Sequence, residues 1–367
     1  MKFIDKKIKK IAVVFSGQPR SIEVTHRYLK DFFNLESVGV KTDYHFHLWN
    51  SADHKSASKE PNSKNSPDIK LDHVKFSNSD LEVLIKDLYD PVYLRIDDQK
   101  TDPKMKELKA IAKHSFPNEL DYTDQLRDVI KKGWFKEYTN NESFEKVKWV
   151  TAHIGQLESA SRACEKILFF EKKFGEKYDI CFRMRTDMVF KNIKTDPEIK
   201  LSNFVRMWNI IDDHRCRGLL NPVFVTYLKL MQGIPQTGDH YFVGDGQSIS
   251  NFNKNAGYAV IKNYKKLIEI CMKEGFEIPN QKNFQKKRDL IGDHSPHRGL
   301  HRPAETSWAE CAYMNKTTLI SSPFVQFLDY SLVRSNVPKN ASIKEICSIW
   351  ENWGKQMTSK MDKHRSE

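Results

Sequence analysis

Long hydrophobic runs and paired cysteines are missing from this sequence. Its six cysteines among 367 residues are widely scattered and form no C-x-x-C pair, which argues against a disulfide framework and against a zinc knuckle. The longest apolar run near the N-terminus, Ile11–Phe15, is too short for a signal peptide or a membrane span. We therefore expect a cytoplasmic protein in a reducing compartment, and we leave open an association with a membrane surface.

Acidic residues are also in deficit. Lysine and arginine outnumber aspartate and glutamate by 60 to 48, which gives a net charge of +12 and a pI near 9.2. This balance favours anionic ligands such as nucleotides or phosphorylated lipids. The basic residues are spread along the chain, with short clusters such as Lys6–Lys10 but no arginine-rich arm. We therefore expect no nucleic-acid partner, and an apolar content of 39% predicts a folded protein with a proper core.

Several common catalytic and nucleotide-binding motifs are absent. The sequence contains no G-x-x-x-x-G-K-[ST] P-loop and no G-x-G-x-x-G fingerprint, so the standard ATPase and dinucleotide sites are not expected. It also lacks a G-x-S-x-G elbow and an H-E-x-x-H helix, which argues against a serine hydrolase and a zinc protease. A site for an anionic ligand must therefore be built from other residues.

The first predicted elements indicate an α/β fold. Ile11–Phe15 has the pattern of a buried strand, and it stops at the turn SGQPR, which contains Gly17 and Pro19. A helix follows with Ser21 as its N-cap, and residues 44–49 are a second strand. Strand, turn, helix and strand are typical of an α/β sheet whose ligand loops lie at the strand ends.

The rest of the chain continues in the same style. A long helix at 150–174 ends at Gly175 and leads into a strand. We expect further helices near 80–88, 257–273 and 306–314, a strand at 92–96, and short apolar segments at 204–211, 223–227 and 241–243. We predict one catalytic domain over 1–340, with a mobile loop at 51–70 and a helical insertion at 97–148, followed by a C-terminal helix or tail at 341–367.

The segment Tyr178–Phe190, YDICFRMRTDMVF, places two arginines and a carboxylate at the end of an apolar strand. Arg183 and Arg185 alternate with apolar residues, and Asp187 continues their side if the strand geometry persists. Arginine forks neutralise phosphate oxygens. A Mg²⁺-like ion uses one or two carboxylates together with phosphates and water. The segment thus suits a diphosphate site, and the alternative is an Arg–Asp salt bridge that closes a strand.

Five segments in order resemble a known family. The SGQPR turn, HFHLWN, the helix leading into YDICFRMRTDMVF, GDHYFVGD and PAETSWAECAYMN are similar to glycosyltransferases of the GT-A fold from polysaccharide and surface-glycan gene clusters. In those proteins an S-G-x-x-R loop faces the nucleotide, and an R-x-R-x-D strand stands where other GT-A enzymes carry Asp-x-Asp. The resemblance covers most of residues 10–330 and is weakest across 52–148. It implies a GT-A-like (Rossmann-like) mixed, mostly parallel sheet flanked by helices, with helical insertions.

The resemblance also implies a reaction and a donor site. The protein would move a sugar from a nucleotide-diphosphate donor to a glycan, lipid-linked or small acceptor, assisted by a divalent metal, Mn²⁺ or Mg²⁺. Asp187 matches the last acid of the Asp-x-Asp-like motif and would bind the metal. Arg185 replaces the first acid, and an arginine can itself neutralise the leaving diphosphate. The residues that would hold the donor and its phosphates are Ser16, Gly17, Gln18, Arg20, Arg183 and Arg185.

The catalytic base and a late metal ligand are less sharply indicated. An inverting enzyme needs a carboxylate to accept the proton of the acceptor hydroxyl, and Asp239, Glu305 and Glu310 are unranked candidates. The run 292–303 holds three histidines beside arginines. Of these, His301 is a candidate to complete the metal shell, as a late histidine does in some GT-A enzymes. A phosphate-facing or merely solvated loop is the alternative.

Two other functions fit the same residues. A nucleotidyltransferase that makes sugar nucleotides would carry a longer glycine-rich first loop with a lysine, of which SGQPR is a poor version. A non-catalytic protein that binds phosphorylated glycans or nucleic acid is favoured by the missing first acid of Asp-x-Asp. The sequence leaves the sugar, the acceptor, the stereochemical outcome and the oligomeric state open.

Overall fold

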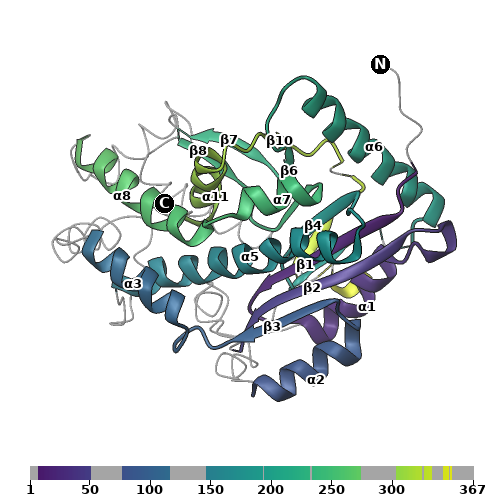
Figure 1. The fold of residues 1–367 in the computed structure, drawn as a ribbon, viewed down its shortest axis with the longest axis horizontal. Coiled ribbons are helices and arrows are strands. Elements are labelled where there is room, and N and C mark those ends of the chain that lie inside the picture. Colours follow the sequence, from purple (N-terminus) through teal and green to yellow (C-terminus); the bar gives the residue numbers. More distant parts are fainter. Residues whose placement is uncertain are drawn as a thin grey trace, which may run out of the picture.

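A seven-stranded sheet forms the centre of the chain in the computed structural model, which describes residues 7–50, 77–115, 146–192, 194–231, 234–273, 303–324, 326–332, 342–346 and 348. The strand order is β10-β6-β9-β4-β1-β2-β3 (Figure 1). Neighbouring strands are parallel, except that β9 runs antiparallel to β4 and to β6. The strands are β1 (Lys10–Gly17), β2 (Lys41–Trp49), β3 (Tyr93–Asp97), β4 (Ile180–Met184), β6 (Val223–Val225), β9 (Tyr241–Gly244) and β10 (Leu319–Ser321). The prediction of a mixed, mostly parallel sheet is confirmed.

Helices cover both faces of this sheet. Figure 1 shows α5 crossing one face and α1 lying behind the sheet. One face packs against α1 (Ile22–Phe33), α2 (Asn78–Tyr89) and α6 (Pro197–Cys216), and a short 3₁₀ helix η1 (Glu36–Val38) precedes β2. The other face packs against α3 (Pro103–Ser115), α5 (Lys146–Phe174), α7 (Gly246–Asn253), α8 (Ala256–Lys273) and α11 (Pro303–Met314). Helices on both faces of a mostly parallel sheet make the α/β class.

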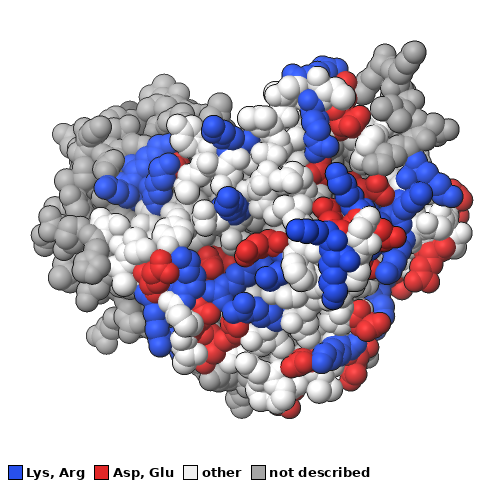
Figure 2. Space-filling view, viewed as in Figure 1, with Lys and Arg blue, Asp and Glu red and all other residues white. Residues whose placement is uncertain are grey.

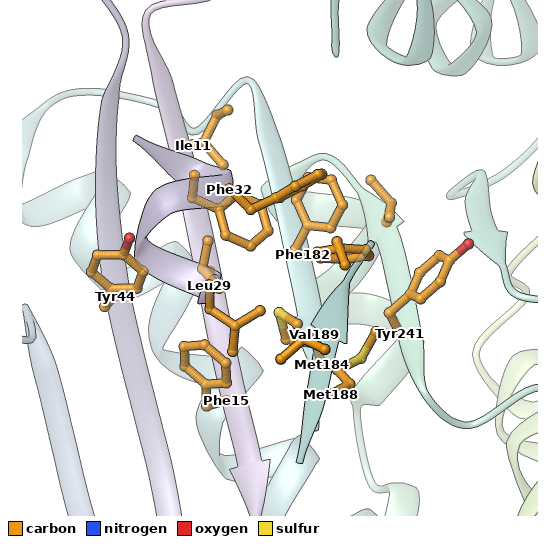
Figure 3. Packing of buried hydrophobic residues seen from close by; sticks show 14 of the residues in the cluster. Ile11, Phe15, Leu29, Phe32, Tyr44, Phe182, Met184, Met188, Val189 and Tyr241 are labelled. Carbon is orange, nitrogen blue, oxygen red and sulfur yellow. The ribbon is translucent and has the colours of Figure 1, made fainter. Parts of the chain in front are cut away.

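The residues of β1 explain why the sheet is buried on both faces. Ile11, Val13 and Phe15 belong to the core under α1, whereas Ala12 and Val14 belong to the core under α5. Because successive side chains of a strand point to opposite faces, a continuous apolar run buries both. Figure 3 shows Phe15, Leu29, Phe32 and Phe182 gathered in the first core.

Two small antiparallel pairs flank the central sheet. β5 (Met188–Phe190) pairs with β11 (Tyr330–Leu332), and β7 (Leu228–Met231) pairs with β8 (Ile234–Thr237). β5 begins only four residues after β4 ends, so the chain between them makes a sharp turn at Arg185–Asp187. This turn carries the arginine and the aspartate that the sequence singles out.

Most of the predicted elements agree with the structure, and one segment differs. The helix predicted at 150–174 is α5, and the strand predicted at 11–15 is β1. The apolar segment 204–211, to which the sequence assigns no helix, lies inside helix α6, where Phe204, Met207 and Ile211 point to the core at helical spacing. Short apolar runs do not by themselves distinguish a strand from a buried helix.

Some predicted regions fall outside the described residues. They include the loop at 51–70, residues 116–145 of the insertion predicted at 97–148, and most of the tail predicted at 341–367. Within the described part of that insertion, α3 is helical and packs against α5. In the part of the chain that the structure describes, no helix has both the length and the apolar character needed to cross a membrane.

Candidate functional site

The candidate site lies at the carboxyl ends of β1 and β4, two adjacent parallel strands between which the strand order of the sheet reverses. β1 and β4 are neighbours, and their last pair is Phe15 with Met184. The chain continues from β1 to β2 on one side of β1, whereas β4 joins β9 on the other side. Ligands of α/β sheets bind outside the carboxyl ends of the strands at such a switch point. The loop Ser16–Arg20 and the turn Arg185–Asp187 both leave the sheet there.

A third segment reaches the same edge from the opposite strand direction. β9 is antiparallel to β4, and Tyr241 at its start pairs with Met184 at the end of β4. Asp239 and His240 immediately precede β9, so they lie at the same edge as the two loops. The sequence segments SGQPR, RTD and GDH are thereby brought together at one edge of the sheet.

Asp187 is held by two guanidinium groups. Arg185 donates to both oxygens of this carboxylate, from Nε to Oδ1 at 2.9 Å and from Nη2 to Oδ2 at 2.7 Å. Arg20 donates from Nη1 to Oδ2 at 2.7 Å. Asp187 is only 1% exposed, so these charge-assisted bonds are shielded from water. The Arg–Asp salt bridge that the sequence allowed is present, and it is a three-residue cluster at a ligand edge.

Asp239 joins the same cluster through its Oδ2 atom. Gln156 of α5 donates to it at 2.9 Å, and Arg185 Nη1 lies 3.3 Å away. His240 Nε2 lies 3.4 Å from Asp239 Oδ1, and the other ring nitrogen of His240 contacts the hydroxyl of Tyr330. Burial alone would raise the pKa of Asp239, but the charges of His240 and Arg185 and the amide of Gln156 hold this pKa below its usual range. Asp239 therefore stays ionised at neutral pH.

Arg183 is fully buried beneath the cluster. Its Nε donates to Ser16 Oγ at 2.9 Å and its Nη1 donates to the carbonyl of Asp239 at 2.9 Å, while Nη2 has no hydrogen-bond partner among the described residues. The guanidinium lies over the rings of Trp308 at 4.9 Å and Phe242 at 5.3 Å. Burial lowers the pKa of Arg183 to about 10, which still leaves the group charged at neutral pH. It ties the first loop to the segment that carries Asp239.

The first loop has the backbone of a close-approach turn. Gly17 has φ +107° and Arg20 has φ 39°, both in the left-handed region, which costs least for glycine. The turn at Thr186 is joined to this loop, because Thr186 Oγ1 donates to the carbonyl of Gln18 at 2.7 Å. Hydrogen bonds thus connect the two loops, and the predicted residues Ser16, Gly17, Gln18 and Arg20 all belong to the first of them.

A buried polar hub supports the first loop, and the sequence alone gave no sign of it. Ser159 Oγ of α5 lies 2.7 Å from the amide nitrogen of Gly17, 2.8 Å from the carbonyl of His47 and 2.8 Å from His47 Nδ1. His47 Nε2 lies 3.0 Å from Asp97 Oδ2. Burial lowers the pKa of His47, although Asp97 partly opposes this. The neutral imidazole therefore links the ends of β2 and β3 to the candidate site.

Replacing Ser159 by alanine should loosen this hub. The change leaves the amide of Gly17 and one nitrogen of His47 without their partner, and a buried group left unpaired costs about 1–3 kcal/mol. We expect the urea midpoint of unfolding to fall, and we expect Ser161→Ala on the same helix to change it little. An unchanged midpoint in the Ser159 variant would show that the hub does not support the loop.

The remaining predicted residues have other partners or lie outside the described part of the chain. Glu310 is buried but its carboxylate pairs with Lys262 at 3.0 Å and Lys266 at 3.6 Å on α8. Glu305 in the first turn of α11 accepts a hydrogen bond from the hydroxyl of Tyr227 at 3.3 Å. His301 and the run 292–302 lie outside the described residues. Of the three candidate bases, Asp239 alone contacts the arginines in the hydrogen bonds and ion pairs described above.

The residues around Asp187 do not suit a divalent metal as they are arranged. Both oxygens of the carboxylate already accept from guanidinium groups. The second carboxylate, Asp239, is engaged by Gln156 and Arg185. Among the described residues, no group of three or more histidine, cysteine, aspartate or glutamate side chains could hold a metal ion. Hard cations need free oxygen ligands, so a metal at Asp187 would have to displace an arginine.

In comparisons with known proteins, no family model, no curated protein and no solved structure matches this chain. Function must therefore be inferred from the site itself. Its features are a switch-point position, three arginines, two carboxylates and a glycine-containing loop.

Proposed function

We propose that this protein is a glycosyltransferase of the GT-A type, which moves a sugar from a nucleoside-diphosphate donor to a glycan, lipid-linked or small acceptor. The observation that carries the proposal is the arginine cluster at the switch point between β1 and β4. Arg20, Arg183 and Arg185 face two carboxylates, which leaves one positive charge among these five side chains. A diphosphate is the donor group that such a site would recognise.

The proposed chemistry asks the cluster to stabilise a leaving group. In glycosyl transfer the bond between the anomeric carbon and a diphosphate oxygen breaks, and an acceptor oxygen forms the new bond to that carbon. Negative charge develops on the departing diphosphate, and preorganised cations lower the barrier most where charge develops. Arg20 and Arg185 would receive this charge, while Arg183 would hold the loops in place from below.

Asp239 is better suited to position its neighbours than to act as the general base for the acceptor hydroxyl. A general base works best when its pKa lies near the operating pH, and the pKa of Asp239 is held low by its charged neighbours. Its carboxylate orients Arg185 and Gln156 instead. Of the other candidates, Glu310 is paired with two lysines. Glu305 is the candidate for the acceptor base that we carry forward.

A second function keeps one observation in its favour. The closed pairing of Asp187 and the low pKa of Asp239 leave the described cluster without an evident base, as a protein that binds phosphorylated glycans without turnover would have. The charge pattern does not extend this idea to nucleic acid. Figure 2 shows basic and acidic residues interspersed over the face that it presents, rather than the single-sign stripe typical of nucleic-acid binding.

The test is a screen of nucleotide-sugars that differ in base and sugar, each incubated with the full chain and the divalent metals Mn²⁺ or Mg²⁺ or with EDTA. We expect one donor class to release its nucleoside diphosphate, slowly into water and faster when an acceptor is present. Thermal stabilisation by the same donor would report binding. If donors bind but no nucleoside diphosphate is released under any metal condition, the non-catalytic function is favoured. If donors neither bind nor release their nucleoside diphosphate, the proposal is contradicted.

A further inference from the structure

We infer that Asp187 serves as the counter-ion of Arg20 and Arg185, and that the diphosphate group of a ligand binds to these arginines without a divalent metal. This inference rests on the proposed function for the identity of the ligand. It assigns to Asp187 a role opposite to that of a metal ligand, since the cation that neutralises the phosphates is already part of the chain.

Both oxygens of the Asp187 carboxylate already bond to guanidinium groups. Three guanidinium N–H groups reach the two oxygens of Asp187 at 2.7–2.9 Å. The side chain is almost fully buried, so water does not compete for these oxygens. A doubly charged ion placed there would meet the positive charges of Arg20 and Arg185 at short range, where the protein screens repulsion weakly.

The arginines of the cluster offer N–H groups to which a diphosphate could bind. Arg20 lies on a loop and its side chain is 21% exposed, so a ligand can reach it from solvent. Arg185 holds Asp239 only by a long contact of 3.3 Å. Arg183 Nη2 is buried and has no hydrogen-bond partner among the described residues. The charge of Arg183 acts together with those of Arg20 and Arg185, and this positive potential would attract an anion.

With the two carboxylates in place, the five side chains of the cluster carry one net positive charge, as counted above. Phosphate oxygens that replace the carboxylate at Arg20 or Arg185 would keep charge-assisted bonds at the same nitrogens. Asp187 therefore competes with the ligand for the arginines, and it holds them in position when no ligand is bound. Removing that competitor should strengthen anion binding.

The experiment measures the affinity of inorganic pyrophosphate for the full chain by calorimetry, in EDTA and again with Mn²⁺. The counter-ion role predicts binding in EDTA that Mn²⁺ does not strengthen. It also predicts that Asp187→Asn binds pyrophosphate about tenfold more tightly, because one negative charge near the ligand is gone. The matched control is Asp213→Asn on α6, an aspartate that also pairs with an arginine, Arg217, and its affinity should equal that of the wild type.

Two results would overturn the inference. One is binding that requires Mn²⁺ and is lost in Asp187→Asn, and the other is no binding of pyrophosphate under either condition. If the variant does not fold, the metal dependence of the wild type still decides. Metal-dependent binding would contradict the counter-ion role but would be compatible with the proposed transferase function. Metal-free binding of pyrophosphate without turnover of any donor would support the anion site and contradict the transferase function.

Discussion

Replacing Arg185 by methionine should lower sugar transfer by about 10²–10³-fold. Arg185 is the residue that contacts both carboxylates, through three of its nitrogens. Removing one preorganised donor from a site where charge develops costs a factor of this size. The loss should appear in kcat/KM for the donor that the nucleotide-sugar screen identifies, because the diphosphate loses its cation in the transition state.

The companion variant separates charge from shape. Arg185→Lys keeps the charge but loses the planar fork that bonds both oxygens of Asp187. We expect a rate between those of the wild type and the methionine variant. Arg20 remains on Asp187 in both variants, so both should fold, which melting temperatures would check. A methionine variant that folds and transfers sugar at the wild-type rate would contradict the role of the cluster.

Replacing Arg162 by methionine should produce the largest loss of stability. Arg162 of α5 donates to Asp97 at 2.6 Å, to both oxygens of Asp102 at 2.7 and 2.8 Å, and to Glu158 at 3.0 Å. Removing one partner of a buried ion pair leaves uncompensated charge and costs about 3–5 kcal/mol. Chemical denaturation at neutral pH would measure the loss in the free energy of unfolding.

The pH dependence of this loss identifies its cause. Burial alone would raise the pKa of both Asp97 and Asp102. Hydrogen bonds from His47 and Arg95 hold the pKa of Asp97 below its usual range, and hydrogen bonds from Arg162 do the same for Asp102. A lowered folded-state pKa contributes stability above the unfolded pKa, about 3.9, and that stability is lost as pH falls through the folded pKa. The deficit of the Arg162 variant should therefore stay constant at neutral and mildly acidic pH and narrow only as pH falls below about 4.

A nearby arginine provides the control. Arg95 also donates to Asp97, at 2.8 Å, but its side chain is 48% exposed. Exposed pairs contribute about 0–1 kcal/mol, so Arg95→Met should change stability little. Equal losses in the two arginine variants, or a deficit in the Arg162 variant that does not depend on pH, would show that paired buried carboxylates are not the cause.

The local elements were predictable because they follow from apolar spacing. The run Ile11–Phe15 and the stripe of the helix at 150–174 give β1 and α5 with small changes of boundary. The turn after β4 was only half predictable. Strand alternation places Asp187 beside Arg185 if the strand persists, but β4 ends at Met184. The two side chains meet across a tight turn instead.

The long-range partners were not predictable from the sequence. Gln156 reaches Asp239, and Ser159 meets Gly17, only because α5 packs across β1 and β2 at this edge of the sheet. Nothing in the spacing of these residues shows the contact. The period-2 pattern places Arg183 and Arg185 on the same side of the strand and predicts the same phosphate-binding role for both. In the structure Arg183 is buried under Trp308, whereas Arg185 lies in the turn. Strand order decides such contacts, and strand order is a tertiary property.

The most direct measurement is a crystal structure of the full chain with the nucleoside diphosphate that stabilises it best, grown in EDTA. The account predicts diphosphate oxygens about 3 Å from nitrogens of Arg20 and Arg185, at the edge between β1 and β4, with Asp187 released from at least one of them. A ligand bound elsewhere on the protein, with both arginines still paired to Asp187, would contradict it.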